Sequence, residues 1–164
     1  MRGPIAGILP LLQPVAHSLL QSLEEVRAVV GPLSSEDLWA RPGGAASVGF
    51  HVRHATGSLD RLFTYARGEG LSADQRAYLD TEAAPGSPPA PAAELVSAFE
   101  RQVARAFEQL RRTPELTLLE ARGVGLLQLP SMVLGLLFHA AEHTQRHVGQ
   151  IVTTARIVLA LALG

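Results

Sequence analysis

The chain has 164 residues, of which 47% are hydrophobic and 18% charged, and its formal net charge at pH 7 is −1. This balance is typical of a folded globular protein, and a near-neutral chain without basic stretches excludes nucleic acid as the expected main partner. The length suits one hydrophobic core, so we predict a single domain over residues 1–164.

The first predicted helix covers residues 11–30, where apolar side chains recur at helical spacing. Its buried stripe is expected to contain Leu12, Val15, Leu19, Leu23, Val26 and Val30. The apolar run before it is short, is interrupted by Pro10 and has no clean cleavage site, so we interpret it as the entry to the helix rather than a signal peptide. We therefore expect a cytoplasmic protein, and no apolar run approaches the length of a membrane span.

Two helical segments and a stiff connection are expected next. Residues 34–39 predict a short helical turn, and residues 48–67 predict a second long helix with Ser47 as its N-cap. Two glycines soon after that helix are stop signals. Residues 74–79 predict one further turn of helix, and the proline-rich residues 84–91 predict a stiff, polar connection.

The second half of the chain supplies two more long helices. Residues 92–111 predict the third, with Leu95, Phe99, Val103, Ala106 and Leu110 buried. Residues 116–129 are ambiguous between an extended pair around Gly123 and an irregular crossover. Pro130-Ser131 is expected to begin the last and most apolar helix. Four long helices with long connections predict an all-α four-helix bundle of up-down-down-up topology.

Two reactive residue types are missing from the composition. The chain has no cysteine, which excludes disulfides, thiolate metal ligands and a cysteine nucleophile. All 14 basic residues are arginine, which excludes a lysine Schiff base and a P-loop lysine. Such an arginine-only chain, rich in alanine, glycine and proline, is typical of a GC-rich bacterial genome. Electrophilic chemistry must come from histidine, carboxylate, hydroxyl, arginine or a bound ion.

Five of the six histidines fall in two windows that both predict helix, His51-Val-Arg-His54 and His139-Ala-Ala-Glu-His143-Thr-Gln-Arg-His147. Side chains three or four residues apart share one face of a helix. Two such helices packed together would gather nitrogen donors around one point, as metal sites in helical bundles do. His17 stands alone in the first helix, and we interpret it as an ordinary core histidine.

Spacing restricts which histidines can share an ion, without selecting one set. His139 and His147 are two turns, or about 12 Å, apart, which is too far for two ligands at about 2.1 Å. The last helix therefore offers either His139 with His143 or His143 with His147, and the second helix adds His51 or His54. The His-x-x-Glu-His order of inverted zinc proteases also occurs at residues 139–143, but no acidic residue follows it to complete that site.

Three short motifs in order resemble those of the DinB/YfiT-like family of metal-dependent bundle proteins, and the resemblance covers most of the chain. They are Leu38-Trp39-Ala-Arg41-Pro42, Ser47-Val-Gly49-Phe50-His51-Val-Arg-His54-Ala55 and His143-Thr-Gln-Arg-His147-Val-Gly149-Gln150-Ile151. In the family a small hydroxylic residue precedes the ligand histidine by seven positions, and two histidines four apart precede Gly-Gln. The resemblance therefore implies His54, His143 and His147 as the metal ligands.

The resemblance also implies an activity and an assembly. It implies a divalent ion, most often Ni²⁺ or Zn²⁺, on three histidines with solvent in the open positions, and a homodimer. His51 and His139 depart from the family pattern as extra imidazoles, which we interpret as second-shell partners, alternative ligands, proton carriers or ordinary polar residues at the mouth of the bundle. Gln150 is a further second-shell candidate. The apolar tail, residues 157–163, is expected to pack against a partner subunit or within the bundle.

Two functional hypotheses follow from these observations. The first is a metal-dependent enzyme acting on a small molecule, as a transferase that uses a low-molecular-weight thiol or as a hydrolase. An ion on three neutral imidazoles favours an anionic further ligand, and any thiol must arrive with the substrate because the chain has no cysteine. The alternative is a non-catalytic stress- or damage-response protein, or a metal-binding bundle that carries or senses the ion.

Overall fold

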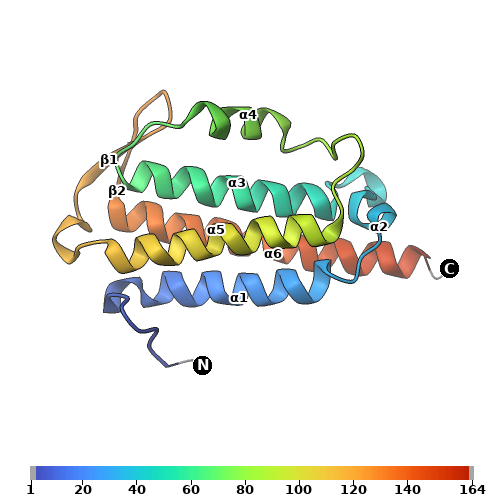
Figure 1. Ribbon diagram of the computed structural model, residues 1–164, viewed down its shortest axis with the longest axis horizontal. Helices are drawn as coiled ribbons and strands as arrows, with labels where there is room; N and C mark the ends of the chain where they lie inside the picture. The colour runs from blue at the N-terminus through green and yellow to red at the C-terminus, as the bar shows by residue number, and fades with distance from the viewer. Residues whose placement is uncertain (1–2, 163–164) are drawn as a thin grey trace.

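The four longest helices of the described chain lie side by side in the computed structural model, which describes residues 3–162 (Figure 1). They are α1 (Gln13–Val30), α3 (Val48–Ala66), α5 (Ala92–Arg112) and α6 (Val133–Ala162). In Figure 1, α1 and α6 run in one direction, while α3 and α5 run in the other. The all-α fold and its up-down-down-up order are confirmed. Among the described residues, no helix combines the length and the apolar character needed to cross a lipid bilayer.

The long helices bury the stripes that the sequence predicts. Val15, Leu19, Val26 and Val30 of α1 are buried, as is Leu12 in the 3₁₀ turn just before it, while Leu23 is partly buried against them. The five apolar side chains predicted for α5 are all buried. The helices pack in a ring, α1 on α6, α6 on α3, α3 on α5 and α5 on α1, so each stripe faces the same core.

Helix boundaries follow from local capping. The Ser47 hydroxyl accepts from the Phe50 amide and begins α3 where the sequence predicts it. The short helix α2 (Ser35–Trp39) begins in the same way at Ser34. Helix α4 (Ala73–Thr81) is longer than the single turn predicted at residues 74–79. A capping box between Ser72 and Gln75, which the sequence analysis did not use, stabilises its first turn.

The ambiguous segment contains a hairpin of β1 (Ala121–Val124) and β2 (Leu129–Met132). The expectation that Pro130-Ser131 begins the last helix is wrong, because Pro130 pairs with Gly123 in this hairpin. Helix α6 begins at Val133, whose amide donates to the Glu120 carbonyl. The residue just before the hairpin thus satisfies a backbone donor that a helix end leaves free. Short 3₁₀ turns at Pro10–Leu12, Pro42–Gly44 and Glu115–Thr117 complete the described elements.

Trp39 joins α2 to two other segments. Its indole nitrogen donates to the Ala90 carbonyl at 3.1 Å, and its ring lies on Gly49 of α3. A Cβ at Gly49 would come within 2.8 Å of the ring, so the glycine permits this contact. The beginning of α3 is thereby fixed two residues before His51.

The described part of the apolar tail is largely exposed. Val158 is buried, but Ile157, Leu159 and Leu161 are exposed by 45%, 44% and 68%. Packing of these three side chains within the bundle is therefore not observed. Residue 163 lies outside the described residues.

Candidate metal centre

His54 on α3 approaches His143 and His147 on α6, which packs along α3. The Nε2 atoms of His54 and His143 are 3.0 Å apart. One donor atom from each of the three imidazoles lies within 4.8 Å of the other two. The structure thus brings together the set that the family resemblance implies.

The donor set fits a divalent ion. Two nitrogens at about 2.1 Å from one ion are about 3.4 Å apart in a tetrahedral arrangement and about 3.0 Å apart in an octahedral one. The distance between the Nε2 atoms of His54 and His143 falls at the lower end of that interval. All three imidazoles are half-buried, so the cluster remains in contact with solvent.

His51 lies behind the cluster rather than in it. Its side chain is buried, and its Nδ1 lies 3.0 Å from Nδ1 of His147. When Nδ1 of His147 is the donor in this contact, the lone pair that can bind an ion is on its Nε2. This contact fits two of the roles predicted for His51, a partner of a ligand imidazole and an alternative ligand.

His139 and Gln150 are farther from the centre. The His139 side chain is 54% exposed, and its Nδ1 lies 3.1 Å from Glu142 at the helix surface. Its ring centroid is 5.7 Å from that of His143. Gln150 is exposed, and its side chain makes no hydrogen bond to another described residue. His139 therefore touches a proposed ligand only through this ring contact, and no hydrogen bond within the described chain joins either side chain to the cluster.

A buried carboxylate beside the cluster was missed by the sequence analysis. Glu82, just after α4, accepts from Nδ1 of His54 at 2.6 Å and from Arg61 at 3.0 Å. Arg61 is itself buried, because it pairs with this carboxylate. The spacing of seven residues between His54 and Arg61, which puts both on one face of α3, was the available signal.

Other charged residues near the centre have ordinary surface partners. Arg53 donates to the Ala84 carbonyl, and Arg146 pairs with Glu142 one turn away. Asp60 accepts from Gln75 of α4 at 2.7 Å.

The electrostatics of the cluster favour neutral imidazoles. Burial, followed by the charge of His54 and the neighbouring histidines, lowers the pKa of His147 to about 3. Burial also lowers the pKa of His143 and of His51, with His54 as the next cause for each. A neutral imidazole has the lone pair that a metal ion requires. Two of the proposed ligands, His143 and His147, are therefore held in the metal-binding form at neutral pH.

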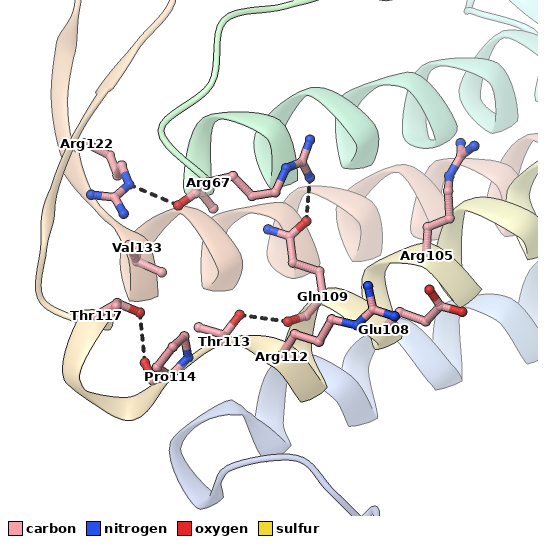
Figure 2. Close-up of a pocket in the computed structure, with 11 residues that line it drawn as sticks. Arg67, Arg105, Glu108, Gln109, Arg112, Thr113, Pro114, Thr117, Arg122 and Val133 are labelled. Atoms are coloured by element: carbon pink, nitrogen blue, oxygen red, sulfur yellow. Dashed lines mark hydrogen bonds between the residues drawn. The ribbon is translucent and has the colours of Figure 1, made fainter.

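A separate cavity of about 480 Å³ lies near the hairpin end of the bundle (Figure 2). Four arginines line it, and none of its lining residues is a histidine. Arg67 donates to Gln109, and Arg122 donates to the Ala66 carbonyl. The histidine cluster and this cavity are thus two distinct polar regions of the molecule.

Comparison with known proteins identifies the family. The family model of the DinB superfamily matches residues 18–151. Among solved structures, the chain is similar to a conserved protein from Enterococcus faecalis, with a TM-score of 0.75 and 17% sequence identity. The similarity covers 91% of this chain and 97% of that protein, and it supports the fold alone. No protein of curated function matches the chain.

Proposed function

The chain belongs to the DinB superfamily, and we propose that it is a metal-dependent enzyme that holds one divalent ion on His54, His143 and His147. The observation that carries the proposal is the convergence of three imidazole nitrogens from two helices within 4.8 Å. Structural zinc sites are usually closed by four protein ligands, whereas three protein ligands leave a position for water or substrate.

The neutral charge of the three imidazoles determines which further ligand a bound ion would favour. Being neutral, they leave the charge of the ion uncompensated, which favours an anionic further ligand such as a thiolate or hydroxide. Bound at such a site, a divalent ion polarises a carbonyl and lowers the pKa of water or a thiol. Any thiol must come from a small co-substrate, because the chain has no cysteine. We therefore propose a small-thiol-dependent transferase or a hydrolase of small molecules.

A small cavity that shares Phe50 with the cluster is the candidate place for a substrate. It measures about 250 Å³, and its lining residues include Phe50 but no histidine. The Phe50 ring stacks on His54 with centroids 5.5 Å apart, so one aromatic side chain is a neighbour of both the cavity and a proposed metal ligand. Arg41 also lines the cavity and provides a positive charge for an anionic substrate.

Metal analysis of protein purified without a histidine tag tests the proposal. We expect about one equivalent of nickel or zinc per chain and stabilisation of the purified protein by the same ion. His143→Ala should remove most of the metal, whereas His17→Ala, which changes a histidine on α1, should keep it. Less than about 0.2 equivalents, together with no thermal shift on adding nickel or zinc, would contradict the proposal.

A non-catalytic metal-binding protein is the second candidate. The observation in its favour is Phe50, whose ring covers both His51 and His54 and limits the approach to the cluster from that side. This candidate predicts tight metal binding without turnover of any small-thiol substrate. Turnover that depends on added metal and is lost in His143→Ala would exclude it.

A further inference from the structure

Glu82 is the one acidic side chain that is buried among the described residues. It lies in the long connection between α3 and α5, at the C-cap of α4. Removing an ionised carboxylate from water is costly unless it is paired and hydrogen-bonded. The side chain is 6% exposed, so its partners must provide that compensation.

Both partners of Glu82 come from one face of α3. His54 Nδ1 lies 2.6 Å from one carboxylate oxygen, and Arg61 contacts both oxygens at 3.0 and 3.4 Å. Gly57, between them on the helix, leaves the space that Arg61 occupies, since a Cβ there would come within 2.7 Å of its guanidinium. The contact is therefore built into α3 as well as into the connection.

The connection is attached to α3 on both sides of Glu82. The Tyr78 hydroxyl donates to the Arg53 carbonyl at 3.1 Å, and the Arg53 side chain donates to the Ala84 carbonyl. These contacts lie four residues before and two residues after the carboxylate. They fix the segment that delivers Glu82 to His54.

The hydrogen bond determines which nitrogen of His54 is available. A carboxylate can only accept, so the proton of a neutral imidazole must be on Nδ1, and the lone pair is then on Nε2. Nε2 is the atom that lies 3.0 Å from His143. Glu82 contacts the opposite edge of the ring, so it cannot itself bind an ion held at Nε2.

We propose that Glu82 is a positioning residue of the metal centre, which orients His54, fixes its tautomer and adds negative charge behind a ligand set that is otherwise neutral. This inference rests on the proposed metal site. Carboxylates that accept from a ligand imidazole raise its basicity, and their loss weakens metal binding by about 10- to 100-fold. A purely structural ion pair with Arg61 would have no such effect on binding.

Two variants separate these roles. Glu82→Gln removes the negative charge at nearly constant size, and Arg61→Met breaks the same ion pair but leaves the carboxylate on His54. We expect Glu82→Gln to weaken zinc binding by about 10-fold or more in competition with a chelator. Arg61→Met should not weaken it, because it removes a positive charge near the ion. Equal weakening in both variants, or unchanged binding in Glu82→Gln, would overturn the proposal.

A second measurement does not require metal. Long-range ¹H–¹⁵N spectra of the metal-free protein report the tautomer of each imidazole. We expect the Nδ1–H form for His54 in the natural protein and the loss of that form in Glu82→Ala. Glu69→Gln, a control at an exposed ion pair, should leave the His54 tautomer unchanged. An unchanged His54 tautomer in Glu82→Ala would overturn the proposal. If the natural protein binds no metal, the proposed function fails, and these spectra still decide whether Glu82 sets the tautomer.

Discussion

The histidine cluster and the arginine-lined cavity of Figure 2 both gather polar side chains from separate elements. In the cluster the polar atoms face one another, whereas in the cavity they are directed to different acceptors. In the cluster, Nε2 of His54 faces Nε2 of His143 at 3.0 Å, while its Nδ1 is occupied by Glu82. In the cavity, Arg67 and Arg122 are directed to neighbouring acceptors instead of to a common point. Convergence of donor atoms, rather than cavity volume or the number of charges, therefore identifies the candidate metal centre.

The largest expected effect comes from removing one converging donor. His54→Ala should weaken zinc or nickel binding by at least about 100-fold, more than the loss of a residue that only hydrogen-bonds to a ligand imidazole. The double variant Arg67→Gln/Arg122→Gln, at the cavity, should stay within about twofold of the natural protein. Chelator competition measures both. A similar loss in both variants would mean that the two regions do not act separately.

A smaller effect is expected on α6, where His147 and His139 are both one turn from His143. His147→Ala should weaken binding by about 10-fold, less than His54→Ala, because His51 lies 3.0 Å from His147 and can replace it as a donor. His139→Ala should change binding by less than about threefold, since that side chain is 54% exposed. A larger loss of metal binding in His139→Ala than in His147→Ala would assign the ligand pair to His139 and His143.

The pH dependence of stability should also originate in the histidine cluster. The pKa of His147 falls from its ordinary value of 6.5 to about 3 in the folded chain, mainly through burial. Below pH 6.5, His147 therefore binds a proton in the unfolded chain but not in the folded chain. The metal-free protein should lose stability as the pH falls from about 6.5 to 3.

Glu82 adds to this loss at lower pH. Burial raises the pKa of its carboxyl, but hydrogen bonds from His54 and Arg61 outweigh burial and lower it overall. Its stabilisation is therefore present above the unfolded pKa and is lost as the pH falls through the folded one. Urea unfolding at several pH values measures the sum. His147→Gln should flatten the upper part of the profile, whereas Arg67→Gln/Arg122→Gln should leave it unchanged.

The smallest expected effects concern packing at the two ends of the bundle. Gly49→Ala, near the histidines, places a Cβ within 2.8 Å of the Trp39 ring and should destabilise the fold by about 1–3 kcal/mol. Gly123→Ala, in the hairpin, meets the end of the Gln128 side chain, which can swing away. We expect a cost below about 0.5 kcal/mol there, as for an ordinary surface change. Thermal unfolding of both variants compares them.

Helical spacing explains how much of this molecule could be predicted from sequence. The apolar stripes of α1 and α5 and the cap at Ser47 are local signals, and they predicted the long helices closely. The hairpin could not be predicted from helical spacing, because it depends on residues 121–124 pairing with residues 129–132. Pro130 was therefore interpreted as a helix start when it is a strand residue.

The candidate site could be predicted only in part, because contacts between distant residues leave no periodic pattern in the sequence. Spacing restricted the histidines to a few sets, but His51 and His54 are one turn apart and only the packing of α3 on α6 separates their roles. Glu82 lies 28 residues from His54 in an irregular connection, so no periodic pattern connects them. Arg61 had a usable signal in its spacing from His54, but its burial depends on Glu82.

X-ray absorption spectroscopy of the tag-free protein loaded with one equivalent of zinc tests the central claim most directly. Three imidazole nitrogens at about 2.0–2.1 Å, with exchangeable oxygen ligands such as water in the remaining positions, are the expected result. The imidazole signal should fall to two in His143→Ala and remain at three in His139→Ala. A centre with one imidazole or none, or the same spectrum in His143→Ala as in the natural protein, would contradict the account.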